Sequence, residues 1–130
     1  MKIQEVAAQT GLSIHALRYY EQIGLVTPIS REDNGHRDYS EDDVYRIRFV
    51  THLRAAGMPI AEIKRYVELA SLGEETYGER LAILEAHQHA VEQHIAELQE
   101  HLGIISRKIA HYRESHQKQL VREQDAEARR

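Results

Sequence analysis

Apolar positions in the first 25 residues predict two short helices. Ile3 and Val6 are spaced as neighbours on one helical face, and Gly11 ends this run. Ser13 is a typical N-cap residue, and Leu17 continues the apolar face of the helix that would follow it. Two helices joined by about four residues that include a glycine are the sequence signature of a helix-turn-helix.

The next segment has the features of a β-hairpin. Pro28 prevents the second helix from continuing, and the dipeptide Asn34–Gly35 is the strongest short-range signal for a tight hairpin turn. The sequence therefore predicts two short strands, at residues 29–31 and 36–39. A hairpin that directly follows a helix-turn-helix is a wing.

Two further helices are predicted after the hairpin. Ser40 and Asp43 have the spacing of a capping box at the start of a third helix, which Gly57 would end. Pro59 favours the start of a fourth helix, because its missing N–H costs nothing at the first helical position. The apolar faces expected to be buried are Val44, Ile47, Val50 and Leu53 in the third helix, and Ile60, Ile63 and Val67 in the fourth.

The most regular pattern lies in the second half of the chain. Ten positions follow one another in alternating steps of three and four residues, as the a and d positions of a coiled coil do, and Gln88 is their one polar member. The stripe would extend about 48 Å along a helix, which cannot bury it alone, so the sequence predicts a homodimer in which a second copy covers it. The predicted interface positions are Leu81, Leu84, Gln88, Val91, Ile95, Leu98, Leu102, Ile105, Ile109 and Tyr112.

Together these patterns predict a mainly α fold. A winged helix-turn-helix domain at residues 1–70 would precede a long C-terminal coiled-coil dimerisation helix at residues 80–116. Residues 71–79 are expected to form a linker loop. The polar residues 117–130 carry no apolar pattern, so a frayed or disordered tail is expected there.

Composition excludes several classes of function. The chain has no cysteine, which excludes disulfides, zinc–thiolate sites and thiol redox sensing. No apolar run approaches membrane-spanning length and no signal-peptide core is present, so a cytoplasmic protein is expected. No nucleophile–base pair, useful carboxylate dyad or glycine-rich phosphate loop stands out, so we expect no enzyme, no catalytic residues, no cofactor and no metal site.

The overall charge does not indicate a nucleic-acid partner. The net charge is −4, and residues 1–70 contain 9 Lys or Arg against 10 Asp or Glu. Any DNA-binding face must therefore be a local patch. The cations able to form one are Arg18, Arg31, Arg37, Arg54 and Lys64.

Three segments of this chain resemble the MerR family of bacterial transcription regulators. They are "IQEVAAQTGLSIHALRYYEQIGLVTP", "NGHRDYSEDDVYRIRFV" and "LRAAGMPIAEIKRYVELA". The resemblance covers residues 1–70 closely, and the coiled coil that follows is similar in placement and length up to about residue 115. The resemblance implies a homodimer that binds a pseudo-palindromic promoter operator. It also implies that the dimer distorts the promoter spacer so that RNA polymerase can engage both promoter elements.

The resemblance also implies which residues contact DNA. The second helix would enter the major groove with Arg18 and Tyr19 facing the DNA, whereas Tyr20 would pack inside the domain. Arginine can pair with guanine or phosphate, and a tyrosine hydroxyl can donate to phosphate. His36 stands where the family usually has tyrosine. The full expected set is Ser13, His15, Ala16, Arg18, Tyr19, Arg31, Asn34, His36, Arg37, Tyr39, Arg54 and Lys64.

The family's known triggers do not carry over to this sequence. Its metal sensors use cysteines, and its drug sensors add a separate domain; the chain most resembles the short aldehyde- or electrophile-responsive branch. In members of that branch a cysteine occupies the position of His52, so thiol addition is impossible here. His87, His94 and His101 repeat every seven residues beside the coiled-coil stripe. They fit either a metal or pH sensor or, as the favoured interpretation, a solvated flank.

Two alternative functions share these features. An architectural DNA-bending protein would share the N-terminal fold, but such proteins usually lack a long dimerisation helix. A coiled-coil interaction protein with a degenerate DNA-binding domain is supported only by the acidic balance of residues 1–70. It would show no salt-sensitive DNA binding.

Overall fold

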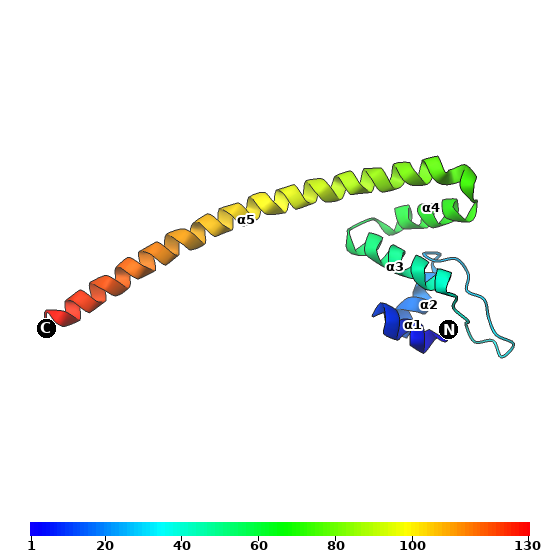
Figure 1. Ribbon diagram of the computed structural model, residues 1–130, viewed down its shortest axis with the longest axis horizontal. Coiled ribbons are helices and arrows are strands. Elements are labelled where there is room, and N and C mark those ends of the chain that lie inside the picture. Colours follow the sequence, from blue (N-terminus) through cyan, green and yellow to red (C-terminus); the bar gives the residue numbers. More distant parts are fainter. The chain divides into compact units, whose positions relative to one another are not determined.

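The structure is a computed structural model that describes all residues from 1 to 130. It contains five α-helices and one 3-10 helix, and the chain divides into two compact units, Met1–His89 and Ala90–Arg130. Figure 1 shows the elements in chain order. Their bounds are α1 Ile3–Thr10, α2 Ile14–Gln22, α3 Glu41–Ala55, α4 Ile60–Ser71, η1 Glu74–Thr76 and α5 Tyr77–Ala128.

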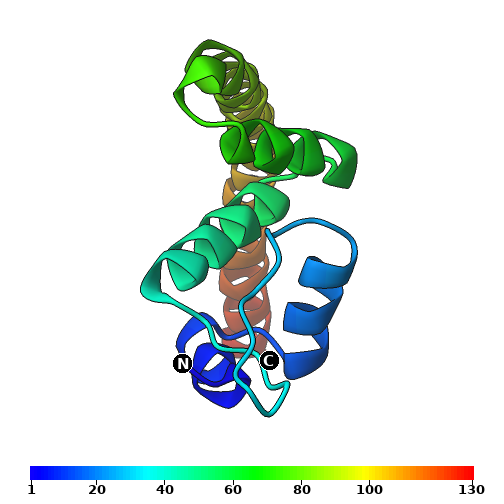
Figure 2. The same ribbon diagram turned by 90° about the vertical axis from the view of Figure 1, so that its right-hand side faces the viewer.

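The first unit is built around one apolar core. Helix α3 lies between α4 on one side and the α1–α2 pair on the other, as both ribbon views show (Figures 1 and 2). The predicted buried face of α3 is confirmed, because all four of its residues are buried. The core residues are Val6, Leu17, Tyr20, Leu25, Val26, Ile29, Tyr39, Val44, Ile47, Val50, Leu53, Met58 and Ile63.

Local capping interactions begin and end the helices where the sequence predicts. Gly11 ends α1 with a left-handed backbone at φ 75°, a conformation that favours glycine. The Ser13 hydroxyl oxygen accepts a hydrogen bond of 3.0 Å from the Ala16 N–H at the start of α2. The capping box of Ser40 and Asp43 at the start of α3 is complete in both directions. The helix-turn-helix prediction is thus confirmed at the level of individual caps.

The wing is less regular than predicted. The expected strands at residues 29–31 and 36–39 are absent, and a single antiparallel bridge joins Arg31 to Arg37. Backbone hydrogen bonds from Glu32 N–H to His36 O and from Asp38 N–H to Ser30 O, both 2.8 Å, complete the hairpin. An isolated two-stranded ribbon is marginal in water, and no third strand lies beside this one. The turn prediction is therefore right and the strand prediction is wrong.

One residue of the predicted core of α4 lies at the surface. Ile63 is fully buried and Val67 is partly buried, but Ile60 is exposed. Ile60 is the first residue of the helix, directly after the N-cap residue Pro59. Met58, which precedes the helix, belongs to the core instead.

The long helix begins earlier and ends later than expected. The segment predicted as a linker, residues 71–79, contains the end of α4, the 3-10 helix η1 and the first residues of α5. Thr76 organises this turn, since its buried hydroxyl donates to Leu69 O at 2.6 Å and Gly73 O at 2.9 Å. Residues 117–128, expected to be frayed or disordered, continue α5 as helix.

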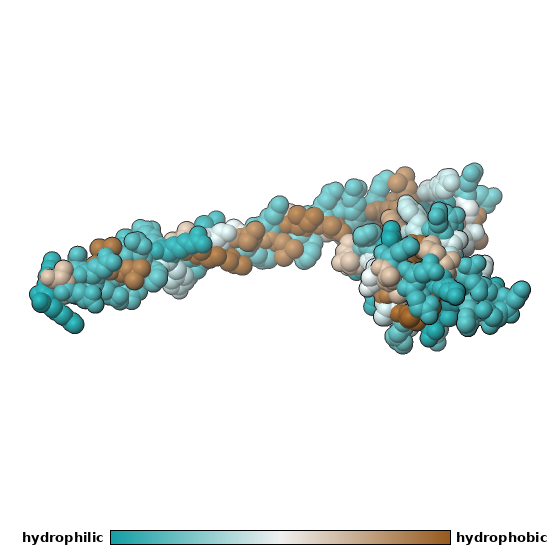
Figure 3. Space-filling model, turned by 60° about the horizontal axis from the view of Figure 1, so that its bottom comes forward, coloured by the Kyte–Doolittle hydropathy of each residue, from teal (hydrophilic) through white to brown (hydrophobic).

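Helix α5 carries exposed apolar side chains along its length. Figure 3 shows hydrophobic residues recurring along it between hydrophilic ones. Ile95, Leu98, Leu102, Ile105, Ile109 and Tyr112 are each between 45% and 62% exposed. From Ile95 to Tyr112 the stripe therefore has no partner within one chain, whereas Leu84, nearer the start of α5, packs in part against the core of the first unit. None of the helices combines the length and the apolar character that a membrane span requires.

The core of the first unit gives a stability prediction. Replacing buried Leu17 by alanine should lower the free energy of unfolding by about 2–5 kcal/mol, because it removes core contacts and leaves a cavity. Chemical denaturation monitored by circular dichroism measures this change. The exposed Leu72 is the matched control, and Leu72→Ala should change stability by less than about 0.5 kcal/mol. Equal effects of the two variants would contradict the core assignment.

Candidate nucleic-acid interface

Helix α2 separates its packing residues from its exposed ones. Leu17 and Tyr20 are buried, Tyr20 to an exposed fraction of 3%, whereas Arg18 is exposed and Tyr19 is 41% exposed. Successive helical residues point about 100° apart, so three consecutive positions cannot share one face. The helix therefore presents Arg18 and Tyr19 to solvent, and the expectation that Tyr20 packs inside is confirmed. His15 is also exposed.

The wing holds its exposed polar residues by local hydrogen bonds. The side-chain oxygen of Asn34 accepts from the His36 N–H at 3.0 Å, and Arg31 Nη1 donates to Gly35 O at 3.1 Å. Gly35 has a φ of 83°, as the turn requires. These contacts use part of the donor capacity of Arg31 and none of that of Asn34, whose side-chain oxygen accepts. Both side chains remain exposed and able to donate to a ligand.

A groove brings the wing, α2 and the start of α1 together. We refer to it as the basic groove. Its lining residues are Lys2, Ile3, Gln4, Arg18, Arg31, Gly35, His36 and Arg37. Four of these are lysine or arginine and none is acidic, although the whole chain is net negative. A concave surface lined by one sign of charge concentrates its potential, so this groove suits a polyanion such as the phosphate backbone.

One largely buried carboxylate fixes the wing against α2. Glu21 accepts hydrogen bonds from Arg37 Nε at 2.6 Å and from the Ile29 N–H at 2.9 Å, and its side chain is 13% exposed. Burial alone would raise the pKa of Glu21, but the hydrogen bonds from Arg37 and Ile29 outweigh it and lower the pKa. Glu21 is therefore ionised at neutral pH. Sequence reasoning missed it, although its position one turn after Leu17 on α2 indicated a carboxylate on a buried face.

Two expected DNA contacts have structural roles. Arg37 lines the basic groove, but its Nε is committed to Glu21. Tyr39 is only 2% exposed, and its hydroxyl is buried with no hydrogen-bond partner. Burial accordingly raises the pKa of Tyr39. Tyr39 belongs to the core, and this burial favours a packing role over a contact between its hydroxyl and phosphate.

The remaining expected residues lie outside the basic groove. Arg54 is exposed on α3, where Nη1 donates to the Tyr20 hydroxyl at 3.3 Å and the guanidinium lies 5.7 Å from the centre of that ring. Lys64 is half-buried on α4. Conversely, Lys2 and Gln4 line the groove and were not predicted. The signal for Lys2 was a cation directly before a helix, where the helix dipole disfavours positive charge.

The structure contains no group of three or more potential ligands that could hold a metal ion. His87, His94 and His101 follow one another along α5 at intervals of about 10.5 Å, too far apart to share an ion within one chain. His52 is exposed on α3.

An exposed Arg–Tyr pair on the second helix of a helix-turn-helix, beside a basic groove, is the arrangement expected of a DNA-binding protein.

Comparison with known families agrees with this class. A family described as MerR HTH family regulatory protein matches residues 1–70, and one described as MerR, DNA binding matches residues 44–105. The chain belongs to the MerR family of transcriptional regulators. Its function as a regulator and not an enzyme follows from this membership.

Individual relatives are similar over different parts of the chain. The HTH-type transcriptional regulator AdhR of Bacillus subtilis (strain 168) is 43% identical over 84 residues, which are 65% of this chain and 60% of AdhR. The chain thus spans less than two thirds of that relative. The crystal structure of HiNmlR, a MerR family regulator lacking the sensor domain and bound to promoter DNA, has a TM-score of 0.80 at 30% identity, covering 87% of this chain and 90% of HiNmlR. The crystal structure of a MerR family regulator from Bacillus thuringiensis has a TM-score of 0.77 at 30% identity, covering 85% of this chain and 96% of that one.

The Glu21 contacts predict a specific dependence of stability on pH. Because its pKa is lower in the folded than in the unfolded state, its stabilising contribution is present above the unfolded pKa of about 4.3. This contribution is lost as the pH falls through the pKa that Glu21 has in the folded state. Glu21→Gln should therefore be less stable than the wild type at pH 7, and this difference should shrink as the pH falls below about 4.

Urea denaturation at several pH values measures this effect. The control is Glu68→Gln, since Glu68 is exposed on α4 and its side chain has no partner. It should unfold like the wild type at every pH. A Glu21→Gln variant as stable as the wild type at pH 7 would show that the carboxylate does not hold the wing.

Proposed function

We propose that this transcriptional regulator acts as a homodimer on double-stranded promoter DNA, with α2 in the major groove and the wing on the phosphate backbone. The observation that carries the proposal is the basic groove beside the exposed Arg18 and Tyr19, because it gathers cations in a chain that is net negative. The crystal structure of HiNmlR on promoter DNA supports the same partner by similarity.

The exposed side chains suit distinct parts of DNA. Arg18 can pair with a guanine edge or a phosphate by its bidentate fork, and the Tyr19 hydroxyl can donate to a phosphate. Lys2 and Arg31 in the basic groove are free of carboxylate partners and suit phosphate. We assign further contacts to Ser13, His15, Ala16, Asn34, His36, Arg54 and Lys64, and to the Nη donors of Arg37, which its Nε contact with Glu21 leaves free. Tyr39 is left out because it is buried.

The second copy of the chain is proposed to cover the apolar stripe of α5. A helix with an exposed apolar stripe needs a partner, and an identical helix is the simplest self-complementary one. The single polar position, Gln88, would help to define the register. The dimer would use Leu81, Leu84, Gln88, Val91, Ile95, Leu98, Leu102, Ile105, Ile109 and Tyr112.

A dimer with two recognition helices related by a two-fold axis is expected to bind a pseudo-palindromic operator, because the symmetry of the DNA site mirrors that of the protein. We propose that the bound dimer distorts the promoter spacer and thereby changes how RNA polymerase engages the promoter. Deforming a site of this length costs on the order of several kcal/mol, which many phosphate contacts can offset. This activity would place the protein in the cytoplasm, with the chromosome.

Binding to the DNA directly upstream of the coding region tests the DNA-binding proposal. Fluorescence anisotropy over a salt series should give an affinity that falls steeply with salt, because neutralised phosphates release counterions. Arg18→Ala should weaken operator binding by about tenfold or more, since one good arginine contact contributes about 1–3 kcal/mol of discrimination. The dimer should remain intact in this variant.

Arg65→Ala is the control for Arg18→Ala. Arg65 is exposed on α4, lies outside the basic groove and forms an ion pair with Glu79 at 3.5 Å. The control should bind DNA like the wild type. Weak binding that does not depend on salt would reject the regulator mechanism and favour a protein-interaction role.

The dimer interface gives a second test. Leu98→Glu should dissociate the dimer, because it places a charge in the centre of an apolar seam, and tight DNA binding should be lost with it. Sedimentation velocity measures the dissociation. Gln93→Glu, five residues earlier and off the stripe, adds the same charge and should leave the dimer intact. A stable dimer of Leu98→Glu would rule out this interface.

A further inference from the structure

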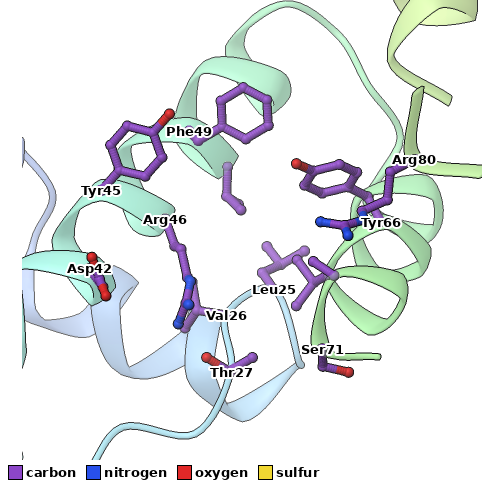
Figure 4. A pocket seen from close by; sticks show the side chains of 13 residues that line it. Leu25, Val26, Thr27, Asp42, Tyr45, Arg46, Phe49, Tyr66, Ser71 and Arg80 are labelled. Atoms are coloured by element: carbon purple, nitrogen blue, oxygen red, sulfur yellow. The ribbon is translucent and has the colours of Figure 1, made fainter. Parts of the chain in front are cut away.

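A cavity of about 500 Å³ lies within the first unit, and none of its lining residues belongs to the proposed DNA-binding set. Figure 4 shows it from close by, with side chains converging from α3, α4, the loop after α2 and the start of α5. We refer to it as the ligand cavity. Its lining residues are Leu25, Val26, Thr27, Asp42, Tyr45, Arg46, Phe49, Val50, Tyr66, Val67, Ala70, Ser71 and Arg80. The volume lies within the range of small-molecule sites.

The ligand cavity has an apolar and aromatic part. Leu25 and Val50 are buried beneath it. The rings of Phe49 and Tyr66 lie 5.7 Å apart between centroids at an interplanar angle of 47°. Tyr45 also lines the cavity and is 73% exposed, so its ring offers an accessible aromatic surface. These surfaces suit a flat, apolar ligand.

The charged side chains of the cavity are mainly cationic. Arg46 and Arg80 line it, with Asp42 as the one carboxylate, and neither arginine lies within 4.0 Å of a carboxylate oxygen. Arg80 donates through Nη2 to Gly73 O at 2.8 Å, while its Nε is buried without a hydrogen-bond partner. The guanidinium also lies 4.5 Å from the centre of the Tyr77 ring, which holds it in place. Nη1 of Arg80 is therefore left without a protein partner, and a charged donor of this kind favours a carboxylate as its acceptor.

We propose that the ligand cavity binds a small aromatic carboxylate. The aromatic part lies against Phe49, Tyr66 and Tyr45, and the carboxylate accepts hydrogen bonds from the Arg80 guanidinium, with Arg46 adding positive charge. A neutral ligand of the same shape leaves the arginines unpaired. A cationic ligand is repelled by them.

The location of the cavity gives the ligand a means to affect DNA binding. Val26 and Thr27 belong to the segment that connects α2 to the wing, and Arg80 belongs to α5. A ligand that contacts both elements favours the conformation in which they are spaced to bind it. The equilibrium between this conformation and any other shifts by the difference in their affinities for the ligand. This regulatory role rests on the proposed function, whereas ligand binding itself does not.

Isothermal titration of the full chain with 2-naphthoate tests the binding. One ligand should bind per chain, with a Kd on the order of 10–100 µM for a ligand of this size. The neutral analogue 2-naphthalenemethanol should bind at least about tenfold more weakly, because hydrogen bonds between charged groups are the stronger ones. Equal binding of the two compounds would overturn the carboxylate assignment.

Two variants locate the site. Arg80→Gln should weaken 2-naphthoate at least about tenfold and bring its affinity close to that of the alcohol. Tyr45→Ala removes an exposed ring, so it should fold normally and still weaken both compounds several-fold. The controls Arg65→Gln and Leu72→Ala change an exposed arginine and an exposed leucine outside the cavity and should bind like the wild type. Absence of saturable binding, or equal binding by Tyr45→Ala and the wild type, would overturn the proposal.

Anisotropy with upstream DNA then tests the regulatory role. Saturating 2-naphthoate should shift the DNA affinity several-fold in the wild type and leave it unchanged in Arg80→Gln. Ligand binding without any shift in DNA affinity would overturn the regulatory role and leave the site assignment standing. The isothermal titration does not require DNA binding. If the protein binds no DNA, the titration still tests the ligand cavity, so failure of the proposed function can be told apart from failure of the ligand site.

Discussion

The arrangement of α2 and the wing, the proposed DNA-binding surface, depends on the hydrogen bonds of one carboxylate. Glu21 lies on α2, and its two donors, the Ile29 N–H and Arg37 Nε, lie in the loop and the wing that follow. A buried carboxylate is tolerated only when it is paired and hydrogen-bonded, so the wing must stay where these donors reach it. The same ion pair compensates the negative charge of Glu21 next to the basic groove. One interaction therefore sets both the geometry and the sign of the surface.

The fold separates the charges of a nearly balanced sequence. Three acidic residues, Glu41, Asp42 and Asp43, occupy the first turn of α3, where the helix dipole favours them. Lys2, Arg18, Arg31 and Arg37, which are up to 35 positions apart in the chain, line one groove without a carboxylate. Net charge thus says little about the partner of this protein. The local distribution of charge accounts for DNA binding in a chain of net charge −4.

Much of the fold could be predicted, and the failures share a cause. Gly11, Ser13 and the Ser40–Asp43 capping box act on residues within four positions, so their roles follow from local spacing. The wing strands were mispredicted, and the burial of Tyr39 was not foreseen, because sheet pairing and burial depend on distant segments. The Tyr39 N–H, for example, donates to Met1 O across 38 positions. Lys2 and Gln4 were missed at the candidate interface for the same reason. Their importance appears only when α1 lies beside the wing.

The sequence by itself determined the helix-turn-helix, the capping of its helices and the apolar stripe of α5, because these depend on helical periodicity and on neighbouring residues. It also indicated the family through the segments around Arg18 and Asn34. Only the tertiary structure decided which polar side chains remain exposed. It buried Tyr39, engaged Arg37 with Glu21 and left Arg46 and Arg80 without carboxylate partners beside an aromatic cavity. Exposure and pairing are decided by whichever segments the fold brings together, and no periodicity within one segment contains that information.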